Sequence, residues 1–140
     1  MVLDRLISKA IVLGDRDQLA QVLTNLMENA IKYGRAPGKV QINVRDATES
    51  LHFRGPAYSI SVSDKGAGID PVHVPRLTER FYRVDDHRSR AVGGTGLGLA
   101  IVKHIVGRHR GRLLIESKLG HGTTMTVILP KFEPHEPTRQ

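Results

Sequence analysis

The stretch AVGGTGLGLAIVKHIV, residues 91–106, places four glycines within six residues and then continues into an apolar segment with helical spacing. Glycine inside a helix or strand costs roughly 0.5–1 kcal/mol relative to alanine, so this cluster indicates that something approaches the backbone closely. It is not a Walker A loop, because no Gly-Lys-Ser/Thr follows the glycines, and it is not a G-x-G-x-x-G fingerprint, because Gly94, Gly96 and Gly98 alternate. What remains is a glycine-rich lead-in to a helix N-terminus, which favours phosphate oxygens; a flexible linker is the alternative.

The composition is that of one globular domain. The chain has 140 residues, no cysteine and no apolar run near the roughly 20 residues that span a bilayer. We therefore expect a cytoplasmic domain without disulfides or cysteine-based zinc sites. The net charge of +7 fits an anionic partner such as a nucleotide, a nucleic acid or an acidic protein, or merely a solvated basic surface. Because aromatic residues make up only 4% of the chain, we expect no nucleic-acid partner.

Two segments predict long helices. Asp15 and Gln18 form a capping-box pattern before the first helix, and Gly34 is a plausible end. Apolar residues recur there with a period of 3.6, at Leu19, Val22, Leu23, Leu26, Met27, Ala30 and Ile31. The second helix is predicted from Leu97 to His109.

Several shorter segments predict strands. They cover residues 11–13, 39–47 and 58–64, followed by a hairpin over 112–130 that turns at 119–122. Short helical pieces, interrupted by Pro75, are predicted over 72–84. This order predicts an α+β two-layer sandwich in which about three helices cover one face of a mixed β-sheet. We expect residues 1–130 to form the domain and 131–140 a flexible C-terminal tail.

Three polar residues lie along one flank of the first predicted helix. Asn25, Asn29 and Lys32 fall together at the border of the apolar stripe. Asparagine is a poor interior helix former, so two at i, i+4 spacing suggest a purpose. An amide oxygen can bind Mg²⁺ and the lysine can meet a phosphate, whereas a solvated helix flank is the alternative.

Asp64 closes the strand predicted over 58–64. Alternation turns its carboxylate toward the same covered side as the apolar residues of that strand, where it is costly unless a donor meets it. The exocyclic amine of adenine would be such a donor, and Gly66 and Gly68 would let a flat base lie against the backbone. The alternative is an aspartate that only caps a turn.

Five segments in sequence order resemble the signature boxes of bacterial sensor histidine kinases. They are LTNLMENAIKY (23–33), DKGAGI (64–69), RFYRVD (80–85), GTGLGL (94–99) and GHGTT (120–124), which resemble the N, G1, F, G2 and G3 boxes. The resemblance covers about residues 14–130 and implies the catalytic, ATP-binding domain of such a kinase. Its fold would be the Bergerat fold, also found in gyrase, HSP90 and mismatch-repair ATPases. Residues 77–90 are similar to phosphate-regulon sensor kinases.

The resemblance also implies a site. Asp64 would bind the adenine amine, Asn29 with Asn25 would bind Mg²⁺, and Arg83 would reach the γ-phosphate. Residues 85–93 would form a lid hinged by the glycines that follow. The implied ATP-binding residues are Asn29, Tyr33, Asp64, Gly66, Gly68, Ile69, Gly94, Gly96, Leu97, Gly98, Leu99, Thr123 and Thr124; the implied catalytic residues are Asn25, Lys32 and Arg83.

Two departures from the family pattern stand out, and one part is missing. Thr78 occupies a position where the F box usually has phenylalanine, and Arg110 interrupts a common His-Gly-Gly. None of the seven histidines lies in the context of a phosphoacceptor; His135 comes closest, with Glu136 and Pro137 beside it, in a tail too short to build a helical hairpin. We therefore expect a monomeric catalytic fragment whose partners are a separate dimerisation domain and a response regulator. Membrane contact would come only through a sensor region.

The main alternative is an independent member of the same fold, such as an anti-sigma-factor serine kinase or an ATPase. Those enzymes need a carboxylate to activate a hydroxyl or water. Their glutamate is expected one helical turn before the metal-binding asparagine, where this chain has Asn25. An amide cannot act as a base, so the sequence favours the histidine kinases.

Overall fold

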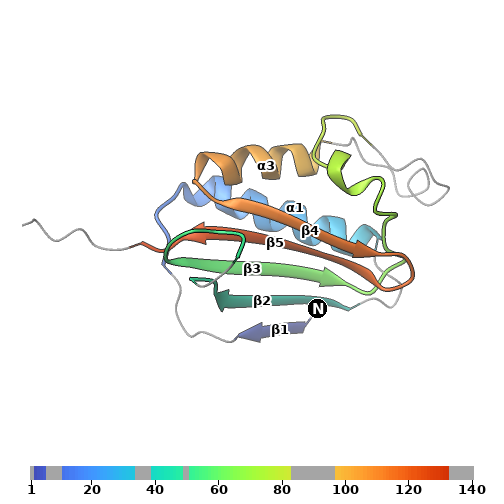
Figure 1. Cartoon of the computed structure of the whole chain (residues 1–140), viewed down its shortest axis with the longest axis horizontal. Coiled ribbons are helices and arrows are strands. Elements are labelled where there is room, and N and C mark those ends of the chain that lie inside the picture. The colour runs from blue at the N-terminus through green and yellow to red at the C-terminus, as the bar shows by residue number, and fades with distance from the viewer. Residues whose placement is uncertain (1, 6–10, 34–38, 49–50, 83–96, 133–140) are drawn as a thin grey trace, which may run out of the picture.

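The computed structural model describes residues 2–5, 11–33, 39–48, 51–82 and 97–132. In this part of the chain, helices α1 and α3 cover one face of a five-stranded sheet (Figure 1). The elements are β1 (Val2–Arg5), α1 (Arg16–Tyr33), β2 (Val40–Asp46), β3 (Ala57–Asp64), the 3₁₀ helix η1 (Val74–Arg76), α3 (Gly98–Arg108), β4 (Arg112–Lys118) and β5 (Gly122–Pro130). The predicted α+β sandwich is confirmed, with η1 as the short third helix of the described residues.

The sheet is mixed, as predicted. Its strand order is β1-β2-β3-β5-β4, with β1 parallel to β2 and the other neighbours antiparallel. In this register Asp64 lies opposite Val40 on one side and Thr123 on the other. Because side chains alternate along a strand, Asp64, Val62 and Thr123 belong to the face that the helices cover.

The core lies between the two helices and this face of the sheet. Its buried residues are Val22, Leu26 and Ala30 of α1, Val102, Ile105 and Val106 of α3, and Val40, Val62, Met125, Val127 and Leu129 of the sheet. Burying such a side chain fully contributes about 1.5–3 kcal/mol. Ile31, predicted in the apolar stripe, is 67% exposed, so the buried stripe is narrower than the sequence indicates.

A histidine joins the two helices at the end of the molecule opposite η1. His109 accepts a hydrogen bond from the Asp15 N–H at Nε2 (2.9 Å) and donates one from Nδ1 to the Ile105 carbonyl (2.8 Å). Gly14 packs on the imidazole, since an added Cβ would lie 2.5 Å from its Cδ2 atom. The predicted cap is confirmed, because the Asp15 carboxylate accepts from the Gln18 N–H at 3.0 Å.

Two local predictions were wrong. Residues 11–13 are not in a strand, and the first strand is β1 at Val2–Arg5; the Ile11 carbonyl instead accepts one hydrogen bond from the Phe132 N–H (2.8 Å). Pro75 does not interrupt a helix but lies in the first turn of η1, where its missing N–H costs nothing.

The first two residues after β5, Lys131 and Phe132, are hydrogen-bonded to the rest of the domain. The Lys131 N–H donates to the Pro56 carbonyl (3.0 Å), and its ammonium lies 2.5 Å from the Asp46 carboxylate. This hydrogen bond holds the pKa of Asp46 well below its usual range. The rest of the predicted tail, residues 133–140, lies outside the described residues. No described helix is long and apolar enough to cross a membrane.

Candidate nucleotide-binding site

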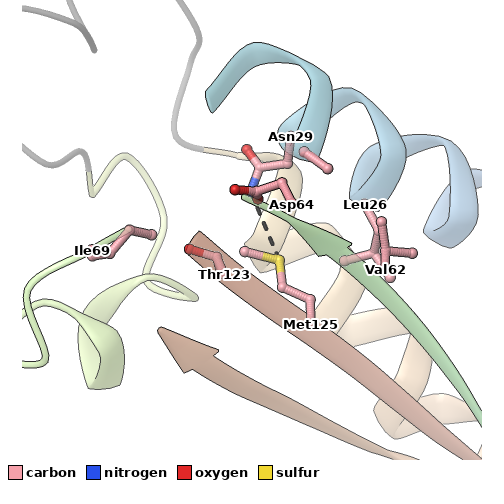
Figure 2. A pocket seen from close by; sticks show the side chains of 8 residues that line it. Leu26, Asn29, Val62, Asp64, Ile69, Thr123 and Met125 are labelled. Atoms are coloured by element: carbon pink, nitrogen blue, oxygen red, sulfur yellow. Dashed lines mark hydrogen bonds between the residues drawn. The ribbon is translucent and has the colours of Figure 1, made fainter. Parts of the chain in front are cut away.

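A small cavity lies between α1 and the ends of β3 and β5 (Figure 2). It is lined by Leu26, Asn29, Ala30, Val62, Asp64, Ile69, Thr123 and Met125. Its volume of about 20 Å³ suits one water molecule, whereas typical ligand pockets exceed roughly 300 Å³. A ring-sized ligand can enter only if a lining side chain moves, and the flexible thioether of Met125 is suited to that movement.

Asp64 caps a turn and also lines the cavity. Its Oδ1 accepts a hydrogen bond from the Gly66 N–H at 2.8 Å, which caps the turn after β3. The same half-buried side chain lines the cavity. An ionised carboxylate only accepts hydrogen bonds, so this position fits a ligand that offers an N–H group.

The loop after Asp64 is pressed onto the turn between β4 and β5. Gly68 has φ +75°, and a Cβ there would collide with the Lys118 carbonyl. Gly66 is buried, and the Ile69 N–H donates to the Ser117 hydroxyl at 2.7 Å. The Ile69 side chain thereby forms one wall of the cavity, facing Thr123 (Figure 2).

The polar flank of α1 divides into three different environments. Asn29 lines the cavity, with Nδ2 3.8 Å from the Met125 sulfur, so Oδ1 is the amide atom left to bind a cation. Asn25 donates from Nδ2 to the Gly98 carbonyl at 3.3 Å, so its side chain contacts the first residue of α3. Lys32 is exposed and does not line the cavity. Tyr33 ends α1, and its side chain lies outside the described part.

The start of α3 carries three of the predicted phosphate-binding residues. Leu97 is the N-cap residue, and its carbonyl accepts from the Ile101 N–H at 2.9 Å. A Cβ added to Gly98 would meet no described atom within 4 Å, so the packing of the described protein does not itself require this glycine. Leu99 is half-buried and packs against the core. The N-terminus of α3 lies next to Asn25, and a helix N-terminus favours an anion.

The two predicted threonines lie on opposite faces of β5. Thr123 lines the cavity and is 7% exposed. Thr124 points to the other face, where its hydroxyl lies 2.9 Å from that of Ser63, so the structure does not bring its side chain to the cavity. Arg83, Gly94 and Gly96 lie outside the described residues.

Sequence reasoning missed Met125 and Ser117. Both face the helices, Met125 two residues after Thr123 and Ser117 directly across the hairpin from it. The alternation along the predicted hairpin was the signal that could have found them.

The family model for histidine kinase-, DNA gyrase B- and HSP90-like ATPases matches residues 14–133. The chain belongs to this ATPase family. Over 127 residues it is 48% identical to the phosphate regulon sensor protein PhoR of Pseudomonas aeruginosa, which covers 91% of the chain and 27% of that protein. It is 46% identical over 119 residues to the sensor-like histidine kinase SenX3 of Mycobacterium tuberculosis, covering 85% of the chain and 27% of SenX3.

Two solved structures have the same fold as this chain. The mycobacterial sensor histidine kinase MprB superposes with a TM-score of 0.78 at 28% identity, over 93% of this chain and 83% of that one. Full-length ShkA, solved in complex with AMPPNP, gives 0.77 at 27% identity, over 99% of this chain and 27% of ShkA. The chain spans about a quarter of the length of PhoR and SenX3. It corresponds to the catalytic, ATP-binding domain of histidine kinases.

Proposed function

We propose that this domain binds Mg·ATP and delivers the γ-phosphoryl group to a histidine on a separate dimerisation domain. The observation that carries the proposal is the cavity in which Asp64 and Asn29 meet, at the end of β3 and on the flank of α1. One offers an acceptor for a base and the other a ligand for a cation. Leu26 and Val62 form an apolar floor of the same cavity, on which a flat ring can pack when the Met125 thioether turns aside.

The donor set at the cavity fits magnesium. The described residues contain no cluster of three or more His, Cys, Asp or Glu side chains that could hold a metal ion alone. Mg²⁺ does not need one, because it usually keeps several waters and takes one or two protein oxygens together with phosphate oxygens. We assign Asn29 as its protein ligand with Asn25 beside it. When bound, the ion neutralises charge on the phosphates.

The remaining proposed contacts follow the family pattern. Lys32 and Arg83 would meet the phosphates, Tyr33 the base, and Gly94, Gly96 and the first turn of α3 the triphosphate. The catalytic work of the domain would be positioning and charge neutralisation, since the attacking imidazole comes from outside. A response regulator would receive the phosphoryl group next. We place this domain on the cytoplasmic side of a membrane-anchored kinase, monomeric on its own.

A phosphotransfer assay tests the proposal. The domain is incubated with Mg²⁺ and γ-labelled ATP, with and without the phosphoacceptor domain of the Pseudomonas aeruginosa PhoR. We expect label on that domain that is acid-labile and alkali-stable, as a phosphohistidine is. Label that appears only as free phosphate would favour the alternative, an independent ATPase. Binding of no nucleotide by the folded domain would overturn the proposal.

Replacing Asn29 with leucine should remove the contribution of magnesium to ATP affinity. Leucine has a similar size and packs against Met125, but it offers no oxygen. We expect Mg²⁺ to tighten ATP binding to the wild type at least about tenfold and to have less than a twofold effect on the variant. Titration calorimetry with and without Mg²⁺ measures this. An unchanged magnesium effect would remove Asn29 as the ligand.

Replacing Asn25 with glutamate should convert the domain toward an ATPase. The carboxylate supplies a base, and it cannot donate to the Gly98 carbonyl as the Asn25 amide does, so it turns away from that oxygen. General bases contribute about 10²–10⁴-fold, and we expect hydrolysis at least about tenfold above wild type. Asn25→Gln, which has the same length but no base, is the control. Equal phosphate release from the two variants would contradict the prediction.

A further inference from the structure

We infer that Ser117 is a positioning residue of the nucleotide site. Its hydroxyl holds the loop of residues 66–69 and fixes which way the Thr123 hydroxyl points. The inference rests on the proposed ATP-binding function for its effect on affinity. Its effect on the loop can be measured without nucleotide.

Ser117 joins three segments at one oxygen atom. It lies on β4 directly opposite Thr123 on β5, with the two hydroxyl oxygens 2.7 Å apart. The same Oγ lies 2.7 Å from the Ile69 nitrogen and 3.2 Å from the Gly122 carbonyl oxygen. Ile69 and Thr123 both line the cavity and Ser117 does not, so the hydroxyl of Ser117 links two lining residues by hydrogen bonds from outside the cavity.

Counting donors and acceptors fixes the direction of each hydrogen bond. A serine hydroxyl donates once and accepts twice. The Ile69 N–H can only donate and the Gly122 carbonyl can only accept, so the Ser117 proton goes to Gly122. Thr123 must then donate to Ser117. The Thr123 oxygen therefore offers only lone pairs to the cavity.

This direction gives the cavity a chemical preference. Thr123 and Asp64 lie directly opposite one another on β5 and β3, and both present acceptors to the same space. Two acceptors suit an exocyclic amine, which has two N–H groups, and repel a keto oxygen. Ser117 thereby contributes to a preference for adenine over a 6-keto purine such as hypoxanthine.

Backbone contacts on both sides of Ser117 support the same loop. The Gly120 N–H donates to the Ala67 carbonyl at 2.7 Å, and Gly68 packs against the Lys118 carbonyl. Of these three described contacts between the loop and the hairpin, the one from Ile69 to Ser117 depends on a side chain. It is the contact that a substitution can remove alone.

The test compares Ser117→Ala with Ser63→Ala in calorimetric titrations with Mg·ATP and Mg·ITP. Ser63 is a matched control, because its hydroxyl makes a similar bond to Thr124 (2.9 Å) on the opposite face of the sheet. We expect Ser117→Ala to weaken ATP binding at least about tenfold and to reduce the ATP preference at least about fivefold. Ser63→Ala should change both less than twofold. Ser117→Thr, which keeps the hydroxyl, should stay near wild type.

Hydrogen exchange of the Ile69 amide in the absence of nucleotide gives the second readout. We expect exchange at least about tenfold faster in Ser117→Ala and unchanged in Ser63→Ala. Unchanged Ile69 exchange, equal ATP losses in the two alanine variants, or a loss in Ser117→Thr as large as in Ser117→Ala would each overturn the inference. If the folded wild type binds no ATP, the proposed function fails, and the exchange rates alone decide the role of Ser117.

Discussion

Replacing Asp64 with asparagine is expected to lower ATP affinity at least about 100-fold while the domain stays folded. The two side chains have nearly the same shape. In one orientation, the asparagine turns its own N–H group toward the N–H group of the base. In the other, the base loses its charged acceptor. A base N–H group left without a good acceptor in a desolvated site is costly. The bond from the Gly66 N–H can persist, since the amide oxygen of asparagine also accepts.

The control for Asp64→Asn lies six residues further along the chain. Asp70 is exposed and accepts from the Val72 N–H at 3.0 Å, in the same i, i+2 arrangement as Asp64 with Gly66. Asp70→Asn should leave ATP affinity within about twofold of wild type. Calorimetric titration with Mg·ATP measures both variants, and urea unfolding checks the fold. Affinity near wild type in Asp64→Asn would exclude this carboxylate from base recognition.

Replacing Gly122 with alanine is expected to lower the free energy of unfolding by about 3–5 kcal/mol. Gly122 has φ +100°, which side chains rarely adopt, and a Cβ there would collide with the Asp64 carbonyl. That oxygen is backbone within the sheet and cannot yield as a flexible side chain would. Because Gly122 begins β5 and Asp64 ends β3, the collision falls on the strand ends that form the site.

A matching substitution at Gly55 measures the cost of the backbone strain without the collision. It has φ +98°, and a Cβ added there would meet no described atom within 4 Å. Gly55→Ala should therefore cost only the strain, about 1–2 kcal/mol. Urea denaturation of the two variants measures the difference between them. Equal losses would show that the strand ends can separate to admit a methyl group.

How far the sequence could predict this structure depended on how local each signal was. The cap at Asp15 and the strand that ends in Asp64 were predictable, because capping and alternation act within a few residues. Strand β1 was not, since four residues carry little pattern and their partner β2 lies far along the chain. The polar flank of α1 was predictable from the helical period, but the division of its residues between the cavity and the start of α3 depends on how the two helices pack.

The position of the Thr124 side chain away from the cavity has a simple physical cause. Adjacent strand residues point to opposite faces, so the motif GHGTT could contribute only one of its threonines to the cavity. Applying the parity of Asp64 across the sheet would have selected Thr123. Residues that are adjacent in the motif point to opposite faces of the sheet, so the motif alone does not tell which of them faces the cavity.

The small volume of the cavity that Met125 lines bears on how tightly a nucleotide is held and how fast it is captured. If only a fraction of molecules has the thioether turned aside at any moment, the observed dissociation constant is the intrinsic one divided by that fraction. The interconversion involves one unbranched side chain and no helix or strand, so it is fast compared with the microsecond-to-millisecond motions of whole elements. The form in which the thioether fills the cavity then lowers the affinity for nucleotide without adding a slow step to association. A ligand-free domain can thus keep its apolar floor covered and still respond quickly when ATP arrives.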